Sequence, residues 1–166
     1  MKNLLKITAI VIVILSMISC GKEQVREPAK VGDDSGFITV SNGQLAKYPV
    51  TGFAYKSAQI PSQEWNNWAR MAAPVVKNIL NKLPAGYVLE VRGHADASGP
   101  EQPEGNKPGN LNISRDRAQA VIKALASAGL TSSKITYKGV GSAELLPKYD
   151  SRSGQQRRVT FAVVPK

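Results

Sequence analysis

Apolar residues in the body of the chain recur with the period of a helix in two places. Between residues 62 and 83 they are spaced by three or four positions, which predicts an amphipathic helix with one core-facing stripe. Pro74 lies inside this stretch and is expected to kink or split the helix, because proline removes a backbone donor. A second helix is expected to begin at Ser114, as its cap, and to end at Gly129 in a left-handed turn.

Other stretches have the alternation, or the β-branched and aromatic content, that is typical of strands. Two candidates, residues 37–40 and 52–58, precede the first helix, and a third, residues 87–92, lies between the helices. Two more follow the second helix at residues 134–138 and 158–164. The order β-α-β-α-β-β predicts an α/β (α+β) sandwich, in which two helices cover one face of a sheet.

Residues 1–19 have the pattern of a secretory signal peptide. Lys2 and Lys6 form a short positive region, and the apolar run 7–18 follows them. At about 1.5 Å per residue this run makes roughly 18 Å of helix, which is too short for a hydrocarbon core of about 30 Å. We therefore expect an export signal and not a membrane-spanning helix.

The stretch Met17-Ile18-Ser19-Cys20-Gly21 resembles a bacterial lipobox, in which the cysteine is acylated and becomes the first residue after cleavage. The resemblance implies a lipoprotein with acyl chains such as palmitate on Cys20, and Gly21 after it resembles the signal for the outer membrane. Two or three acyl chains hold a protein on a membrane stably. The alternative interpretation is a buried free cysteine in an uncleaved helix.

Residues 21–36 are polar and lack apolar periodicity, so they are expected to form a flexible tether behind the acylated cysteine. A coil of this length spans roughly 20–25 Å, which lets a folded domain reach away from its bilayer. The expected organisation is a signal peptide over residues 1–19, Cys20 and the tether over residues 20–36, and one folded domain over residues 37–166.

The composition narrows the chemistry that this domain can perform. The chain of 166 residues has one cysteine and one histidine, which excludes an internal disulfide framework and metal sites built from several cysteines or imidazoles. Lys and Arg number 22 against 12 Asp and Glu, for a formal net charge of +10. Because the basic residues are scattered, we expect no nucleic-acid binding, but an attraction to an anionic wall or membrane surface. No cofactor or metal is expected.

Four blocks of residues follow one another in the body of the chain. They are Gly93-His94-Ala95-Asp96, residues 110–118 (Asn-Leu-Asn-Ile-Ser-Arg-Asp-Arg-Ala), Gly139-Val140-Gly141 and Gln156-Arg157-Arg158-Val159. Together they resemble the OmpA-like peptidoglycan-binding domain, whose pattern is G-H-T-D, N-x-x-L-S-x-x-R-A, G-x-G and N-R-R-V. The resemblance covers roughly residues 50–164 and implies two main helices on one face of a mixed four-stranded sheet.

The resemblance also implies a binding role for four side chains. Asp96 and Arg117 would form a clamp for diaminopimelate, the zwitterionic diamino acid of the peptidoglycan stem peptide, and Asn110 and Arg157 would line the same pocket. The ammonium of such a ligand needs an anion, and the guanidinium fork of arginine suits its carboxylate better than lysine would. The implied protein anchors the outer membrane to the cell wall by binding peptidoglycan.

Reasoning from the residues alone supports the same two side chains. Asp96 comes just past the carboxyl end of a predicted strand, where open sheets place their ligands. Arg117 falls in the first turn of its predicted helix, where a cation opposes the helix dipole unless an anion compensates it. Two other interpretations stay open: Asp96 as a solvated loop acid or a cap, and Arg117 as a surface arginine paired with Asp116 or Glu101.

The chain departs from the family pattern in two ways that bear on the ligand. The loop between Asp96 and Asn110 is longer than in most of the family, with an insertion at residues 101–105. The stretch 53–56 (Phe-Ala-Tyr-Lys) lacks the acidic residue that some relatives carry near the ligand. These features look most like spirochaetal OmpA-like lipoproteins, in which the wall's diamino acid need not be diaminopimelate. An ornithine wall would offer Arg117 no second carboxylate.

Two rival functions remain to be weighed. An enzyme is disfavoured: His94, Asp96 and Ser114 form a triad only on paper, since there is no G-x-S-x-G elbow and no fixed pair of carboxylates for glycoside hydrolysis. The other rival is a surface-exposed adhesin or interaction lipoprotein that binds host or envelope proteins. We therefore expect a non-catalytic, lipid-anchored outer-membrane protein whose partner is peptidoglycan.

Overall fold

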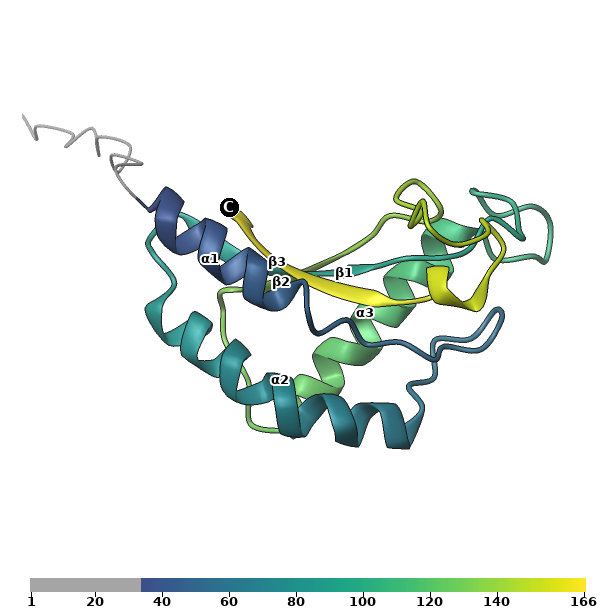
Figure 1. The fold of residues 1–166 in the computed structure, drawn as a ribbon. Helices are drawn as coiled ribbons and strands as arrows, with labels where there is room; N and C mark the ends of the chain where they lie inside the picture. The colour runs from purple at the N-terminus through teal and green to yellow at the C-terminus, as the bar shows by residue number, and fades with distance from the viewer. Residues whose placement is uncertain (1–33) are drawn as a thin grey trace, which may run out of the picture.

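The computed structural model describes residues 34–166, which form three α-helices and one three-stranded sheet (Figure 1). The elements are α1 (Ser35–Leu45), α2 (Ser62–Lys82), β1 (Tyr87–Gly93), α3 (Asn110–Ser127), β2 (Ile135–Gly139), the 3-10 turn η1 (Gly154–Gln156) and β3 (Val159–Pro165). None of these helices combines the length and the apolar composition that crossing a bilayer requires. The expected signal peptide, Cys20 and the tether up to residue 33 lie outside the described residues.

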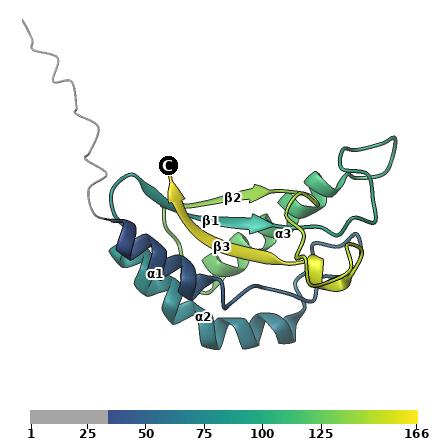
Figure 2. The same cartoon turned by 45° about the horizontal axis from the view of Figure 1, so that its top comes forward.

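The sheet is mixed, with strand order β2-β1-β3 (Figure 2). The central strand β1 runs parallel to β2 and antiparallel to β3, so that Leu89 pairs with Ile135 on one side and with Val163 on the other. The helix α3 makes the crossover that the parallel pair requires. The helices α2 and α3 lie on one side of the sheet, below it in Figure 1.

The alternation of side chains along β1 decides which residues form the core. Leu89 and Val91 are fully buried against the helices, whereas Glu90 and Arg92 point to the opposite face of the sheet. Leu89 and Val91 belong to the core cluster between the sheet and the helices. Its members on the helices include Trp68, Val76 and Ile79 of α2 and Ala118, Val121 and Leu125 of α3. All of its fully buried members lie between residues 45 and 163, so we expect residues 34–166 to fold as a unit.

Both predicted helices are present, and the predicted end of the second is confirmed. Gly129 has a φ of 77°, and the Leu130 amide donates to the Leu125 carbonyl at 2.9 Å, as in a Schellman turn. Of the kink or split expected at Pro74 in the first helix, the split is wrong, because α2 continues through it, and the kink stays a prediction. Pro74 is exposed there, so the carbonyl that loses its helical partner can bond water instead.

The predicted cap at Ser114 is wrong, because α3 begins at Asn110. The Asn110 amide donates to the Pro100 carbonyl at 2.8 Å, so the preceding loop and not a side chain satisfies the start of the helix. The Ser114 hydroxyl is inside α3, where it donates to the Leu111 carbonyl and accepts from the Gly141 amide. It therefore ties α3 to the loop after β2.

Residues 37–40, predicted as a strand, belong to α1. Their β-branched and aromatic side chains favour a strand locally, but tertiary contacts decide the outcome. Phe37 and Ile38 pack against the core as helix residues. The side-chain amide of Asn42, on the same helix, accepts from the Val163 amide at 2.6 Å and donates to the Val163 carbonyl at 3.1 Å. That pair covers part of the outer edge of β3, where a further strand would otherwise bind.

Residues 52–58, also predicted as a strand, are irregular. Val50 alone forms a bridge to Val159, and Gly52 and Lys56 then have φ values of 83° and 55°, which lie outside the strand region. Three carbonyls of this stretch accept hydrogen bonds from the side chains of Arg117 and Arg157 instead of from a neighbouring strand: those of Phe53, Ala54 and Ser57. The described sheet therefore has three strands and not the expected four. Along the described residues the helices and strands follow one another in the order α-α-β-α-β-β.

Candidate functional site

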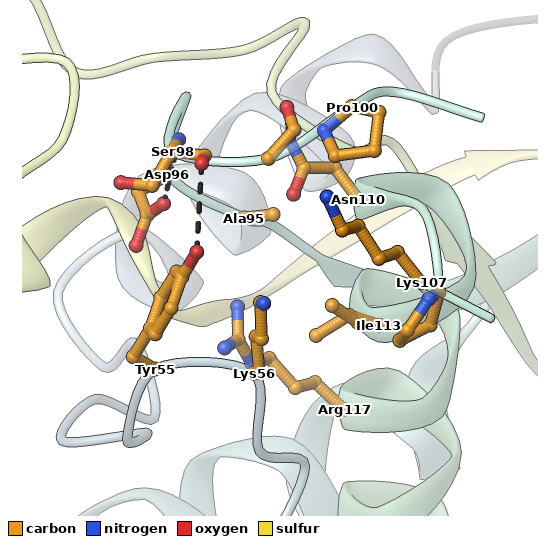
Figure 3. Close-up of a pocket in the computed structure, with 12 residues that line it drawn as sticks. Tyr55, Lys56, Ala95, Asp96, Ser98, Pro100, Lys107, Asn110, Ile113 and Arg117 are labelled. Atoms are coloured by element: carbon orange, nitrogen blue, oxygen red, sulfur yellow. Dashed lines mark hydrogen bonds between the residues drawn. The ribbon is translucent and has the colours of Figure 1, made fainter. Parts of the chain in front are cut away.

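Three loops meet at the carboxyl end of β1 and β2, which is also the end at which β3 begins (Figure 2). Two of these loops, residues 46–61 and 94–109, enclose a pocket of about 160 Å³ together with α3 (Figure 3). It is lined by Tyr55, Lys56, Ala95, Asp96, Ser98, Gly99, Pro100, Lys107, Pro108, Asn110, Ile113 and Arg117. Pockets that enclose a whole drug-sized ligand measure about 300–1,000 Å³, so this one suits a single side chain or amino-acid head group.

Two glycines let α3 approach the strand ends closely enough to reach this pocket. A Cβ atom on Gly93 would collide with the Ser114 carbonyl oxygen, and one on Gly139 would lie 2.5 Å from the Arg115 nitrogen. Only residues without a side chain fit there. This close packing places Asn110 and Arg117 of α3 beside the end of β1, and it gives a physical reason for the glycines of two of the four sequence blocks.

Arg117 is the largest fully buried side chain of the described residues, with 1% of its surface exposed. Its Nε donates to the Ser57 carbonyl at 2.8 Å, and its two terminal nitrogens donate to His94 and Ala54 carbonyls at 2.9 and 3.1 Å. Burial lowers the pKa of the Arg117 guanidinium to about 10, and the charge of Arg157 contributes to the shift, whereas Asp96 opposes it.

The position of Arg117 corrects two expectations. Since α3 begins at Asn110, Arg117 lies two turns into the helix and not in its first turn, so the helix dipole does not explain its need for an anion. Nor is it a surface arginine paired with Asp116 or Glu101, because it is buried and donates to carbonyls. Three of its five N–H groups are used within the described part of the chain, and its charge has no carboxylate partner there within 4.0 Å.

Asp96 is buried and held by Arg157. One carboxylate oxygen accepts from a terminal nitrogen of Arg157 at 2.8 Å, and the other accepts from the Ser98 amide at 2.9 Å. Burial raises the pKa of the Asp96 carboxyl, but the hydrogen bonds from Arg157 and Ser98 outweigh it and leave the pKa below its usual value. With 3% of its surface exposed, Asp96 is not the solvated loop acid that the sequence left open.

Arg157 stands behind Asp96 and does not line the pocket itself. Its Nε donates to the Phe53 carbonyl at 2.7 Å, which draws the loop before α2 over the site. Gln156 beside it is fully buried, and its side-chain amide bonds the backbone of Leu146, Tyr149 and Asp150. The glutamine thereby organises the loop that presents Arg157 to Asp96.

Asn110 lines the pocket from the first turn of α3. Its side-chain nitrogen Nδ2 donates to the Gly99 carbonyl at 3.1 Å, so the Asn110 side chain also holds the long loop in place. The same loop is tied at Glu101, whose carboxylate accepts from the Ser142 hydroxyl at 2.7 Å and from its amide. The insertion at residues 101–105 is therefore anchored to the loop after β2 and brings Lys107 to the pocket wall.

The structure thus places the four predicted side chains in one region, but not all in one role. Asp96, Asn110 and Arg117 line the same pocket, and Arg157 supports Asp96 from outside it. Sequence reasoning missed four polar lining residues: Tyr55, Lys56, Ser98 and Lys107. They lie in irregular loops, where no period of the sequence marks them. Within residues 34–166 no three acidic, histidine or cysteine side chains are grouped closely enough to hold a metal ion.

The comparison with protein families fits this arrangement. The model of the OmpA family matches residues 52–159, well over half of the chain and all four sequence blocks. This chain belongs to the OmpA family. OmpA-like domains are in general non-catalytic binding domains of the cell envelope, and no enzyme family is found. No curated protein sequence matches the chain.

Solved structures of OmpA-like domains share the fold. The peptidoglycan-associated lipoprotein from Burkholderia pseudomallei is 21% identical, with a TM-score of 0.55, over 73% of this chain and 93% of that one. The C-terminal domain of MotB from Helicobacter pylori is 21% identical, with a TM-score of 0.53, over 71% of this chain and 86% of that one. At these identities the likeness concerns the fold alone, so the OmpA-type pocket has to be interpreted from its own residues.

Proposed function

We propose that this domain binds the stem peptide of peptidoglycan, with the diamino acid between Asp96 and Arg117. The observation that carries the proposal is the pocket itself, where a buried arginine without a carboxylate partner in the described structure lies near a buried aspartate (Figure 3). A zwitterionic ligand suits such a pair, because its carboxylate neutralises the cation and its ammonium meets the anion.

Each side chain has bonding capacity left for this ligand. Arg117 has two N–H groups that are not used within the described residues, and its other three fix the plane of the guanidinium. Asp96 accepts one hydrogen bond at each oxygen, so lone pairs remain for an ammonium. Both groups are held rigidly before the ligand arrives, which reduces the entropy lost on binding.

We further propose that diaminopimelate is the diamino acid, because its side chain ends in both an ammonium and a carboxylate. Ornithine offers only the ammonium, so Arg117 would stay without an anion in an ornithine wall. The name of the Burkholderia pseudomallei relative, a peptidoglycan-associated lipoprotein, supports a wall ligand for this fold. The wall-binding role is non-catalytic.

The proposed anchor is the acylated Cys20, followed by a tether up to the start of α1 at Ser35, with the outer membrane as its location. Hydrogen bonds to charged groups contribute about 1.5–3 kcal/mol each, so one pocket is expected to bind in the micromolar range. A tethered domain beside a repeating polymer has a high effective concentration, and many such anchors together hold a membrane to its wall.

Co-sedimentation of residues 34–166 with purified sacculi tests the proposal. Wild type is compared with Asp96→Asn and Arg117→Lys, which keep the side-chain volumes, and with Glu144→Gln as a control carboxylate outside the pocket. Circular dichroism checks that all four proteins fold. We expect the wild type and the control to pellet with diaminopimelate sacculi, and both pocket variants to stay in the supernatant.

The wall type is a second arm of the same experiment. On ornithine sacculi, the wild type should pellet much less than on diaminopimelate sacculi. Equal pelleting on both walls would contradict the assignment of diaminopimelate but not of peptidoglycan. Normal pelleting of a folded Asp96→Asn protein would show that the clamp is misassigned.

A further inference from the structure

The pocket carries more positive charge than one zwitterionic ligand requires. Lys56 and Lys107 line it together with Arg117, and Arg157 stands behind Asp96. We call these five residues the pocket cluster; it contains four cations and one anion. Asp96 is the single acid among the lining residues of the described chain, and Arg157 already neutralises it.

We propose that Lys56 and Lys107 form a second anion subsite, which binds a free carboxylate of the stem peptide other than the one at Arg117. This inference rests on the proposed function. The ligand class is a peptide with a free carboxylate next to its diamino acid. That carboxylate is either the α-carboxyl of a γ-linked glutamate before the diamino acid or the chain terminus after it.

Lys56 is held at the pocket in a backbone conformation that is costly for its residue type. Its φ of 55° lies in the left-handed region, which residues other than glycine adopt only where the surroundings impose it. Those surroundings are the neighbouring carbonyls of Ala54 and Ser57, which bond Arg117. The Lys56 ammonium lies 5.1 Å from the centre of the Tyr55 ring and has no carboxylate within 4.0 Å in the described structure.

Lys107 reaches the pocket from the opposite side, on the long loop. Its backbone pairs with Glu104 through two hydrogen bonds of 3.0 and 3.1 Å, which close a tight turn at the tip. The base of the loop is fixed where Glu101 bonds Ser142. Figure 3 shows the Lys56 and Lys107 side chains extending from different walls into the space beside Asn110 and Arg117.

The two lysines stand on the two features that set this chain apart from the family pattern. Lys56 ends the stretch in which some relatives carry an acidic residue, and Lys107 follows the insertion in the long loop. Both departures change the charge of the same pocket in the same direction. The physical consequence is selectivity for a ligand with an additional negative charge, an effect that salt weakens because both ammonium groups are exposed.

Titration calorimetry at low salt tests the subsite, with residues 34–166 and the tetrapeptide L-Ala-γ-D-Glu-diaminopimelate-D-Ala. Four forms of the peptide are compared: unmodified, amidated at the glutamate α-carboxyl, amidated at the C-terminus, and amidated at both. The protein variants are Lys56→Gln and Lys107→Gln. Lys123→Gln is the matched control, since it removes an exposed lysine about 20 Å along α3 from the pocket end of the helix.

We expect the wild type to bind the unmodified peptide roughly five- to ten-fold more tightly than the doubly amidated one. Each pocket lysine change should weaken binding of the unmodified peptide by about two- to five-fold and leave the doubly amidated peptide unaffected, as for partly exposed ion pairs. The singly amidated forms identify which carboxylate the subsite takes, because amidation of that group alone removes the preference.

Equal affinity of the wild type for all four forms would overturn the subsite while leaving the proposed function in place. The subsite would also be overturned if Lys123→Gln weakened binding as much as Lys56→Gln, because general charge would then explain the effect. If the wild type bound none of the four forms, the proposed function itself would fail, and this inference with it.

Discussion

Two groups of charged side chains lie at the same end of the sheet and differ in their balance of positive and negative charge. The pocket cluster has four cations and one anion. On the sheet face that the helices do not cover, Glu90, Arg92, His94, Glu144 and Arg158 form what we call the outer cluster. The outer cluster contains two arginines and two carboxylates, and Arg92 forms ion pairs with both Glu90 and Glu144.

The difference fits the proposal that the outer cluster serves the fold and that the pocket cluster binds an anionic group. In the outer cluster both arginines have an acid nearby: Arg92 bonds Glu90 of β1 and Glu144 of the loop after β2. Arg158 donates to the Gln156 and Glu144 carbonyls, and although burial lowers the pKa of Arg158, the Glu144 charge opposes that shift. In the pocket cluster, Arg117 is buried more deeply and also donates to carbonyls, but the acid near it, Asp96, is already paired with Arg157. Because a buried charge without a counter-charge is costly, its retention at a pocket points to an anionic ligand.

Removing one buried arginine from each cluster should give the largest effects. Arg117→Met leaves three carbonyls, one of them buried, without their donor and leaves a buried site partly empty, so it is expected to lower the free energy of unfolding by about 3–5 kcal/mol. Arg158→Met removes two such bonds and should cost about 2–3 kcal/mol. Urea denaturation measures both changes.

The two arginine variants are expected to differ in whether they still bind the peptide. Peptide binding should disappear in Arg117→Met and persist in Arg158→Met, measured at a temperature where both proteins are folded. Loss of binding in a folded Arg158→Met protein would show that the outer cluster is not purely structural.

The predictable parts of the molecule are those whose sequence pattern is local. Strands β1, β2 and β3 and the end of α3 at Gly129 follow from alternation and from one glycine. By contrast, α1 forms where a strand is predicted, and its Asn42 bonds a strand residue 121 positions later. No local window contains that contact, so neither the helix nor the loss of the fourth strand is visible in the sequence.

The site divides in the same way. Asp96, Asn110 and Arg117 stand in sequence blocks with a family pattern, and the structure places them around one pocket. Lys56 and Lys107 come from loops whose course is set by side-chain bonds to Arg117 and Glu101. The sequence shows that these loops are unusual, but only the fold shows that they bring two cations to the same place.

Acid should act on the outer cluster before it acts on the pocket cluster. Burial, and then the charges of Arg158 and Arg92, lower the pKa of His94 to about 3, so its ring stays neutral in the folded protein. In the unfolded chain the histidine binds a proton below about pH 6.5, which lowers the free energy of unfolding as the pH falls from there. At pH 5 the loss is about 2 kcal/mol relative to pH 7.5.

His94→Gln should remove most of this slope, since an amide can still donate to the Thr160 hydroxyl and does not titrate. Urea denaturation of both proteins at pH 7.5, 6 and 5 provides the test. Asp96 contributes little in this range: its pKa is lowered, so its stabilisation is lost only in stronger acid, as the pH falls through the folded value. An equal slope in His94→Gln and wild type would show that another group carries the pH dependence.

The smallest expected effect tests whether the long loop is an ordered part of the pocket cluster. Glu101→Ala removes the bonds to the Ser142 amide and hydroxyl, which hold the base of the loop that carries Lys107. The free energy of unfolding should fall by about 1 kcal/mol or less, because the contact is partly exposed.

Glu104→Ala is the matched control, since its side chain makes no hydrogen bond or ion pair in the described structure. Calorimetry with the unmodified tetrapeptide should show a loss of about two-fold for Glu101→Ala, no larger than that for Lys107→Gln, and none for Glu104→Ala. If both glutamate variants bound the peptide equally, Lys107 would not depend on the ordered loop, and the contrast between a closed outer cluster and a pocket built to receive charge would then rest on Lys56 and Arg117 alone.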